Sequence, residues 1–243
     1  MSAIGVSLPK LEYAIREVSR CLEQNNTHRP KWDAMNENDL WRELVACILG
    51  SRVRFDVAHA AIERMDKAGL FSSAHRFLRS DEYEHDILRV LAATGKAGED
   101  SGLQGRYPFP RLRAKQIRTA AGTLYADGGT IRRLLQEAHD MREVRRRLSA
   151  DVAGLGPKQA SLFLRNVGYA IHVAVLDIHV LTYMNWIGLT PSLLKTIRTV
   201  RQYEMLEDAF VEHSCSAGFP PSLYDVAVWV VVRVAKKEPA LCR

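Results

Sequence analysis

The sequence predicts an all-α protein, and three observations support that class. Apolar residues recur at the spacing of one helix face along most of the 243-residue chain. Gly, Pro and Asp punctuate these segments, with no low-complexity segment and no clear repeat. One such break, Gly154-Leu-Gly-Pro-Lys158, is typical of a tight turn between two helices. This pattern excludes a sheet protein.

The helices can be placed in chain order from their apolar spacing and their end signals. They are predicted over residues 39–49, 54–67, 81–91, 111–118, 131–139, 141–148 and 157–166. Asn38 is the expected N-cap of the first helix, and Gly50 and Gly69 are expected to end the first two. Residues 94–110 are rich in glycine and polar side chains, so we expect a long surface loop there.

The break at Gly154 leads into the most distinctive helix. Gly154 and Gly156 are expected to adopt backbone angles that a side chain would penalise, and their missing side chains also admit a close partner. Pro157 suits the first position of the new helix, which continues to Gly168. The main-chain N–H groups at such a helix start suit a phosphate.

Lys158 lies in the first turn of this helix, where the helix dipole disfavours a positive charge and tends to lower the pKa of an amine. A lysine that is more often neutral is a better nucleophile. Asp177 follows Lys158 by 19 residues. Lys158 taken alone is typical of a solvated helix start, but the glycines, Pro157 and Asp177 together favour a reactive amine.

The composition is compatible with a polyanionic partner. The chain has 34 Lys and Arg against 28 Asp and Glu, a formal net charge of +6 and a sequence pI near 9.2. With 47% hydrophobic residues, it can bury one substantial core or two modest ones.

The spacing of the cysteines and the N-terminal sequence indicate whether a metal site, a secretory signal or a membrane span is to be expected. Cys21, Cys47, Cys215 and Cys242 lack the close spacing that a zinc or iron–sulfur site needs, so no metal is expected. The N-terminus lacks the order of a secretory signal, and no apolar run approaches a membrane span. We therefore expect a cytoplasmic protein with no membrane partner.

The hairpin with Lys158 and Asp177 resembles the signature of the helix-hairpin-helix DNA glycosylases, which is G-x-G-x-K followed at a similar distance by an aspartate. Within that superfamily, residues 154–169, and above all Phe163-Leu-Arg-Asn-Val-Gly-Tyr169, are most similar to the second-type 8-oxoguanine DNA glycosylase/AP lyases of archaea and bacteria. The resemblance extends more weakly over residues 36–236. Another branch carries a four-cysteine cluster after its last helix, and this chain lacks that cluster.

The resemblance implies a two-lobed helical fold with the active site in the cleft between the lobes. One lobe would comprise residues 36–170 and end in the helix-hairpin-helix. The other would combine residues 1–35 with residues 171–243 and carry Asp177 together with the base pocket.

The resemblance also implies contacts with the DNA backbone. Gly154, Gly156 and Gln159 of the hairpin would approach phosphates. His179 would contact a phosphate near the reaction centre, although a packed histidine stays open as an alternative.

Two local patterns stay ambiguous. The valines of residues 172–176 allow a short strand, whereas the resemblance favours a connector into the helix that bears His179. The run Arg145-Arg-Arg147 is typical of a solvated helix face, but its place just before the hairpin also allows it to border the duplex.

The resemblance implies excision of a modified base, 8-oxoguanine, from double-stranded DNA after the nucleotide is flipped out. Ionised Asp177 would stabilise positive charge on the sugar while neutral Lys158 attacks C1′ and displaces the base. The resulting Schiff base would permit β-elimination on the 3′ side. Associated AP lyase activity is therefore expected.

Asp225 and Trp229 are candidates for the base pocket. They are four residues apart and so share one helix face, where they would pair a carboxylate acceptor with a flat stacking surface. The corresponding residues line the base pocket in the family that the chain resembles. The alternative for Trp229 is a place in the hydrophobic core.

Two departures from the family bear on the base that is removed. Arg52, in Ser51-Arg-Val-Arg54, stands where related enzymes usually carry Gln or Asn, which affects the opposite-base contact or the pocket. The C-terminus, residues 236–243, extends past the end of the short family members. An alternative function is therefore removal of another modified base, such as glucosylated hydroxymethylcytosine of phage DNA in antiviral defence, because Asp225 could accept a hydrogen bond from the cytosine amino group.

A second alternative is a non-catalytic helix-hairpin-helix module that binds DNA, which would need neither Lys158 nor Asp177. No metal, redox or organic cofactor is expected, except that the resemblance allows a monovalent cation at the hairpin carbonyls. We expect a monomer associated with nucleoid DNA.

Overall fold

The computed structural model describes residues 7–25, 31–72, 81–93, 106–138, 140–170, 172–192, 194, 196–197 and 199–237. Within these ranges the secondary structure is helical and contains no strand, which confirms the all-α class. The elements are α1 (Leu8–Gln24), α2 (Glu37–Leu49), α3 (Phe55–Lys67), α5 (Asp81–Ala92), α6 (Pro110–Leu124), the 3₁₀ turn η1 (Ala126–Gly128), α7 (Ile131–Glu137), α8 (Met141–Asp151), α9 (Pro157–Asn166), α10 (Ile178–Trp186), α11 (Val200–Ser216) and α12 (Pro221–Lys237).

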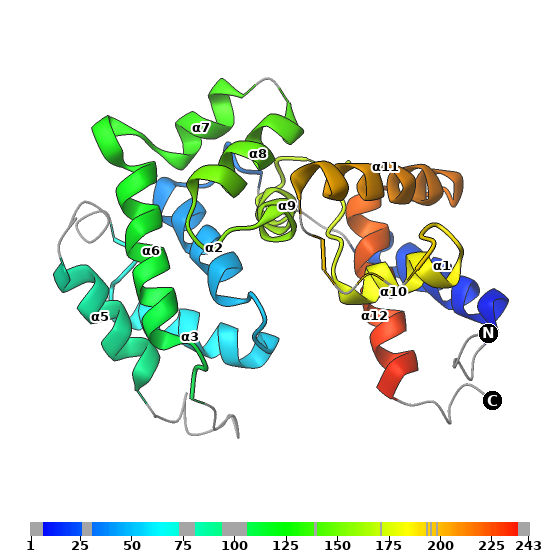
Figure 1. The fold of residues 1–243 in the computed structure, drawn as a ribbon, viewed down its shortest axis with the longest axis horizontal. Helices are drawn as coiled ribbons and strands as arrows, with labels where there is room; N and C mark the ends of the chain where they lie inside the picture. Colours follow the sequence, from blue (N-terminus) through cyan, green and yellow to red (C-terminus); the bar gives the residue numbers. More distant parts are fainter. Residues whose placement is uncertain are drawn as a thin grey trace. The chain divides into compact units, whose positions relative to one another are not determined.

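The chain forms two compact units (Figure 1), each of which is described by itself. Unit 1 comprises Met1–Arg29 and Ala170–Arg243, and unit 2 comprises Pro30–Tyr169. The sequence-based expectation for the lobe that corresponds to unit 2 was residues 36–170. Each unit buries its own cluster of hydrophobic side chains.

Helix α2 lies at the centre of unit 2, where it contacts α3, α6, α7 and α9. Its apolar face is fully buried, as at Leu40, Trp41 and Leu44. The expected N-cap Asn38 is wrong: Asn36 has the extended backbone of a cap, and its side chain accepts a hydrogen bond from the Asp39 main-chain N–H at 2.9 Å. The helix therefore begins two residues earlier than a cap at Asn38 implies.

The expected surface loop over residues 94–110 is only partly within the described residues, since residues 94–105 lie outside them. Residues 106–109 have no regular structure and are exposed at Arg106, Pro108 and Phe109, as expected, whereas Tyr107 departs from that expectation. Tyr107 is fully buried, its hydroxyl donates to the Leu49 carbonyl at 2.7 Å, and Pro110 already begins α6. This segment thus packs onto the end of α2.

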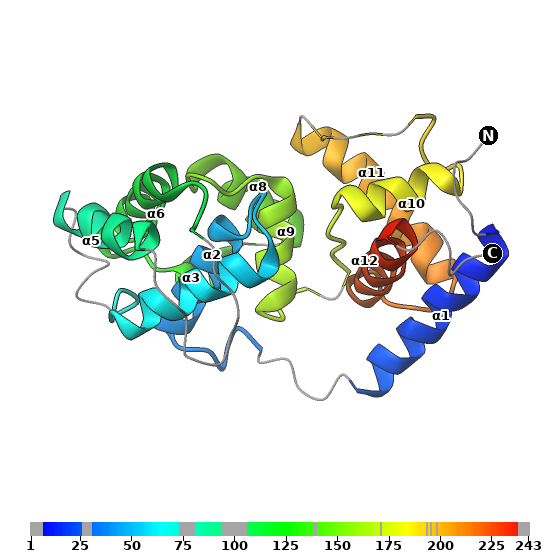
Figure 2. The same cartoon turned by 90° about the horizontal axis from the view of Figure 1, so that it is seen from below.

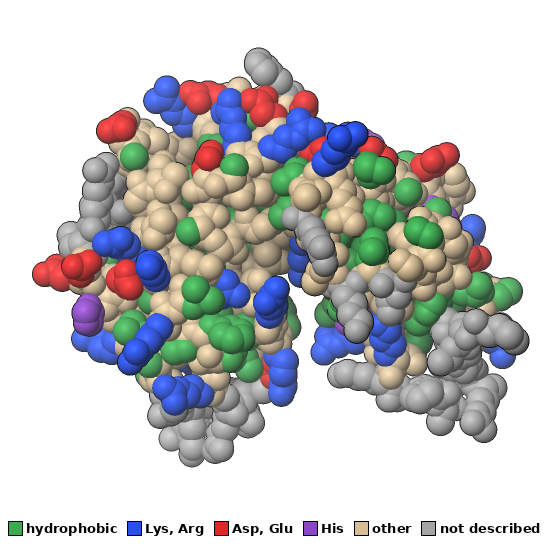
Figure 3. All heavy atoms as spheres, in the orientation of Figure 1, with side chains coloured by type: hydrophobic (Ala, Val, Ile, Leu, Met, Phe, Trp, Pro, Cys, Tyr) green, Lys and Arg blue, Asp and Glu red, His purple; other side chains and the backbone are tan. Residues whose placement is uncertain are grey.

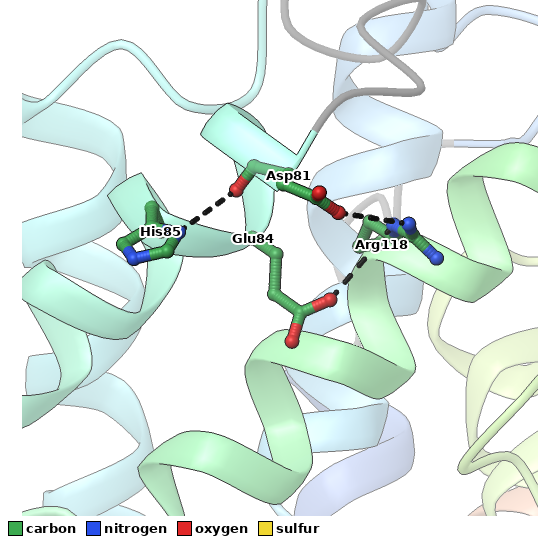
Figure 4. A network of polar contacts seen from close by, with 4 residues as sticks. All are labelled: Asp81, Glu84, His85 and Arg118. Atoms are coloured by element: carbon green, nitrogen blue, oxygen red, sulfur yellow. Dashed lines mark hydrogen bonds and ion pairs between the residues drawn. The ribbon is translucent and has the colours of Figure 1, made fainter.

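Arg118 links α6 to α5 through a network of polar contacts (Figure 4). Its guanidinium lies 3.2 Å from Asp81 Oδ1 and 3.8 Å from Glu84 Oε2, and the His85 ring contacts the Asp81 carbonyl. These groups are partly exposed, so each pair is worth at most about 1 kcal/mol. The network supports the packing of two helices.

The basic run in α8 does not form a uniform solvated face. Arg145 is fully buried, and its Nη1 donates to Ser161 Oγ on α9 at 3.3 Å. Arg147 pairs with Glu143 at 2.8 Å on the same helix. The idea that Arg145 borders the duplex is therefore wrong, because it ties α8 to α9 inside unit 2.

Helix α12 lies at the centre of unit 1, where it contacts α1, α10 and α11 (Figure 2). Tyr183 on α10 bonds to His213 of α11 at 2.9 Å and to Tyr224 of α12 at 3.1 Å. Among the described residues, no single helix is long and apolar enough to cross a membrane; α11 and α12 meet that test only as a pair bent by 91°.

Candidate active site

The turn between α8 and α9 uses its two glycines for different reasons. Gly154 has a φ of +86°, and a Cβ there would lie 2.8 Å from the Gln116 side chain and 3.2 Å from Ile48. Gly156 has an ordinary φ of −80° as the N-cap of α9, and no atom lies within 4 Å of its Cβ position. The expectation of glycine-only angles is right for Gly154 and wrong for Gly156.

Lys158 is half-buried in the first turn of α9. Its charge lies close enough to act on the buried thiol of Cys47 in α2. Burial raises the pKa of Cys47 well above its ordinary value, the nearby Glu43 carboxylate raises this pKa further, and the positive charges of Arg165 and Lys158 oppose the rise. The Cys47 thiol therefore stays neutral and is a poor nucleophile.

Gln159 follows Lys158, but its side chain does not face outward. It is 5% exposed, and its Nε2 donates to the Cys47 carbonyl in the last turn of α2. This contact fixes the start of α9 on α2. The part of Gln159 that suits a phosphate is its main-chain N–H in the first helical turn.

Asp177 in unit 1 is the N-cap of α10. Its Oδ1 accepts hydrogen bonds from the main-chain N–H groups of His179 at 2.8 Å and Val180 at 2.9 Å. The carboxylate is thus oriented by the helix that it begins, and it is half-buried.

The connector before Asp177 is extended but pairs with no strand among the described residues. Side chains of α11 and α12 bind its N–H groups in the following way: Ala174 N to Glu207 Oε1 at 3.1 Å, Val175 N to Asp225 Oδ2 at 2.6 Å, and Leu176 N to the Tyr203 hydroxyl at 3.1 Å. Tyr203 also donates to the Ala174 carbonyl at 2.7 Å. The strand alternative is therefore wrong, and the connector interpretation is right.

Sequence reasoning missed Glu207 and Tyr203 as residues that hold Asp177 in place. Glu207 is 1% exposed, an unusual position for a carboxylate in a helix. An acid on the apolar face of the helix is the only signal that the sequence carries for this role.

The two candidates for the base pocket in unit 1 have different surroundings. Asp225 is 1% exposed and bonds to Val175 of the connector. Trp229 is half-buried, with the Arg233 guanidinium 4.8 Å from its ring centroid and the His179 ring edge-on at 6.4 Å. Trp229 is therefore not a fully buried core residue, and the structure places His179 beside it.

Lys236, the first residue of the expected C-terminal extension, is part of α12. Its Nζ donates to Thr182 Oγ1 at 2.8 Å. Partial burial lowers the pKa of Lys236, and the negative charge of Asp177 opposes that shift. Within unit 1, Lys236 thus lies near Asp177, whereas residues 238–243 lie outside the described residues.

The remaining candidate, Arg52, lies in unit 2 between α2 and α3, where it is exposed with a φ of +61°. Arg52 and Lys158 thus belong to one unit, and Asp177, Asp225 and Trp229 belong to the other. In the described part of the chain, no group of three or more His, Cys, Asp or Glu residues could hold a metal ion.

Comparison with known proteins identifies the family. Residues 96–219 match the family model of the helix-hairpin-helix 8-oxoguanine DNA glycosylases. The 8-oxoguanine DNA glycosylase/AP lyase of Sulfurisphaera tokodaii is 32% identical over 194 residues, which are 79% of this chain and 81% of that protein.

Two solved structures share the fold. The 8-oxoguanine DNA glycosylase of Thermotoga maritima aligns with a TM-score of 0.70 at 23% identity, over 93% of this chain and 95% of that one. The Methanocaldococcus jannaschii 8-oxoguanine glycosylase/lyase, solved with a 15mer DNA containing 8-oxoguanine, aligns with a TM-score of 0.64 at 19% identity, over 92% and 89%. From the matched model and the S. tokodaii relative, the chain belongs to the 8-oxoguanine DNA glycosylase family of helix-hairpin-helix proteins.

Proposed function

We propose that the chain is a DNA N-glycosylase and AP lyase that excises 8-oxoguanine from double-stranded DNA. The activity named for its relatives supports this function. The observation that carries it is the pair of reactive groups, each at a helix start: the amine of Lys158 in the first turn of α9 and the carboxylate of Asp177 as the N-cap of α10.

In the proposed reaction, the lone pair of neutral Lys158 Nζ forms a bond to C1′ of the flipped nucleotide as the C1′–N9 bond breaks. The bonding electrons leave with the base, which takes up a proton, while Asp177 stabilises positive charge on the sugar. Nζ then gives up one proton, and O4′ takes up a proton as the C1′–O4′ bond opens, which gives a protonated Schiff base between Nζ and C1′ and a hydroxyl at C4′. Removal of a C2′ proton then expels the 3′ phosphate by β-elimination, and hydrolysis releases the lysine.

The surroundings of both groups support these roles. Two N–H groups hold the Asp177 carboxylate in one orientation, so little reorganisation is needed during the reaction. No protein atom approaches the Cβ position of Gly156, which leaves room for a phosphate at the start of α9. His179 beside Trp229 offers a further polar group near Asp177.

Borohydride trapping tests the lysine directly. The wild-type protein should form a covalent adduct with a duplex that contains 8-oxoguanine, since reduction fixes the Schiff base. Lys158→Gln should abolish the adduct but keep DNA binding, whereas Lys67→Gln, at an exposed lysine of the same unit, should leave trapping unchanged. Absence of an adduct with the wild-type protein would contradict the role of Lys158.

Asp177→Asn tests the carboxylate without removing the helix cap, because asparagine also caps helices well. Single-turnover excision should be slow, while the melting temperature should stay close to that of the wild type. A normal excision rate would remove Asp177 from the mechanism.

A panel of duplexes tests the base. We expect excision of 8-oxoguanine; excision of glucosylated hydroxymethylcytosine alone would instead support the function in phage defence, to which the exposed Arg52 points. Binding without any abasic product would assign the chain to the non-catalytic DNA-binding modules.

We propose further that the enzyme acts as a monomer on nucleoid DNA and needs no metal or organic cofactor. Lysine and carboxylate chemistry supplies every step above. Excision should therefore persist in EDTA, and sedimentation at working concentration should give the mass of one chain. A monovalent cation at the hairpin carbonyls would appear as tighter DNA binding in potassium than in tetramethylammonium salts.

A further inference from the structure

Lys236, near the end of α12, is a lysine close to a candidate reactive group, and the reaction proposed above does not use it. Its Nζ donates to Thr182 Oγ1 on α10 at 2.8 Å. Thr182 Oγ1 donates in turn to the Ile178 carbonyl at 2.5 Å, in the first turn of α10. These two hydrogen bonds hold the lysine amine against the start of the helix that Asp177 caps.

The Lys236 amine and the Asp177 carboxylate are brought together by one helical turn. The side chain of Thr182 reaches this turn because side chains on a helix lean toward its N-terminus. The Asp177 carboxylate binds main-chain N–H groups of the same turn and lies close enough for its charge to act on Lys236. All three residues belong to unit 1, so the proximity exists within one compact unit.

The surroundings of the Lys236 amine favour its neutral form. Its acceptor is a hydroxyl oxygen, which accepts from a neutral amine as well as from an ammonium group. Partial burial lowers the pKa of Lys236, and the opposing charge of Asp177 does not cancel this shift. A lysine with a lowered pKa is neutral more often near pH 7, and the neutral amine is the nucleophile.

The Lys236 side chain is also accessible to a bound polyanion. The residue is exposed, and Arg233, three residues earlier on α12, adds a guanidinium beside Trp229. Figure 3 shows Lys and Arg side chains at the surface over the lower part of the unit in which α12 ends. Positive charge at this surface attracts the phosphates that flank a sugar in DNA.

We propose that Lys236 is a second Schiff-base lysine, which acts on abasic sites that have already lost their base. This inference rests on the proposed function, in which Asp177 lies at the sugar of the damaged nucleotide. Part of the sugar in an abasic site is an open chain with an aldehyde at C1′. Addition to an aldehyde displaces no base, so it does not need the alignment with a leaving base that excision requires of Lys158. Lys236 therefore cleaves abasic DNA but releases no base.

The reaction at Lys236 begins when Nζ bonds to C1′ of the aldehyde and a proton moves from nitrogen to oxygen. The carbinolamine takes up a proton and loses water, which gives a protonated imine. The Asp177 carboxylate accepts a C2′ proton, and the 3′ phosphate leaves with its bonding electrons, which cuts the strand. Water then hydrolyses the imine and returns the lysine and an unsaturated aldehyde.

The test uses the whole chain with Lys158→Gln, borohydride and a duplex that carries one natural abasic site. This variant should form no adduct with 8-oxoguanine DNA, because it makes no abasic site, but it should be trapped on the abasic duplex. Adding Lys236→Arg keeps the positive charge but removes the amine, so the adduct should fall at least about tenfold. Adding Lys10→Gln, at an exposed lysine of α1 in the same unit, should leave the adduct unchanged.

Two measurements separate a held amine from an incidental one. Adding Thr182→Val removes the hydroxyl that holds Nζ and should also reduce the adduct, and the peptide that carries the reduced sugar should contain Lys236. A duplex with a tetrahydrofuran abasic analogue has no aldehyde, so it should be bound but not trapped. Affinity for this duplex corrects the adduct yields for any difference in DNA binding.

Lack of an adduct between Lys158→Gln and the abasic duplex would overturn the inference. An equal adduct after addition of Lys236→Arg, or a reduced sugar on another lysine, would do the same.

The failure of this inference can be told from the failure of the proposed function. If the wild type forms no adduct with 8-oxoguanine DNA but Lys236 is trapped on the abasic duplex, the proposed excision is wrong and the second lysine stands. If the wild type is trapped on both duplexes but Lys158→Gln on neither, only the second lysine is wrong.

Discussion

The two hairpin glycines allow the role of a close DNA contact to be separated from the demands of the fold. In Gly154→Ala the new Cβ would meet Gln116 at 2.8 Å with the backbone at a φ of +86°, so the protein itself resists the change. In Gly156→Ala the φ of −80° accepts alanine, and no atom lies within 4 Å of the Cβ. Only a bound partner would collide with it.

The expected magnitudes follow from these geometries. A left-handed alanine costs about 1–2 kcal/mol and overpacking about 1–3 kcal/mol, so Gly154→Ala should destabilise the protein by about 2–4 kcal/mol. For Gly156→Ala, the gain of about 0.4–1 kcal/mol from a less flexible unfolded chain offsets the poorer N-cap. The net change in its free energy of unfolding should be within about 1 kcal/mol of zero.

DNA binding, unlike stability, should be sensitive to Gly156→Ala. If a phosphate accepts from the N–H groups at the start of α9, a methyl group at Gly156 displaces it and costs about 1.5–3 kcal/mol, the worth of a charge-assisted hydrogen bond. That loss corresponds to roughly 10- to 150-fold weaker binding.

Urea unfolding and fluorescence anisotropy with the abasic-analogue duplex measure the two effects separately. Gly156→Ala with wild-type affinity would refute a phosphate contact at this residue. Gly156→Ala as unstable as Gly154→Ala would refute the geometric account of the turn.

Three further predictions concern groups away from the hairpin. Asp225→Ala leaves the buried Val175 N–H without its acceptor, so it should lower the free energy of unfolding by about 1–3 kcal/mol. Single-turnover excision should also be slower. Unchanged stability would assign Asp225 to ligand recognition. Burial raises the pKa of Tyr107 to about 12, above its unfolded value near 10, so the folded state keeps this proton longer and stability should fall as pH rises from about 10 to 12. Between pH 9.5 and 11, urea unfolding should show about 1 kcal/mol less loss of stability in Tyr107→Phe than in the wild type, and an equal loss would contradict this origin. At pH 7.5, alkylation mapped by mass spectrometry should modify the exposed Cys21 and Cys215 but modify Cys47 only after denaturation, because the Cys47 thiol is buried and its pKa is raised; rapid native labelling of Cys47 would contradict its burial.

Helix types were predictable from the sequence because they depend on local spacing, but one helix start was not. Asn36 and Asn38 are equally good caps by local propensity. The start at Glu37 places its carboxylate where it accepts from the Tyr125 hydroxyl at 2.9 Å and the Ile131 N–H at 2.7 Å. Those partners lie about 90 residues further along the chain, and no local pattern contains them.

The conformation of the connector before Asp177 was also not predictable from local sequence. Its valines fit a strand because strands and buried extended segments have the same local composition. What distinguishes them is the source of the hydrogen-bond partners. Here the partners are side chains of Tyr203, Glu207 and Asp225, and nothing near residue 175 in the sequence reveals them.

The positions of the two candidate reactive groups were predictable because each is defined within one helical turn: Lys158 by the turn that begins α9, and Asp177 by the cap of α10. The surroundings of Arg52, a candidate for contact with the base or the duplex, have no such local definition. The turn at Arg52 depends on Tyr107 and Arg113, which are far along the chain, and the same Arg113 reaches Gly154 through Gln116. Because Arg113 and Gln116 of α6 contact both the turn at Arg52 and the turn at Gly154, the conformation at Arg52 depends on partners that no local pattern contains.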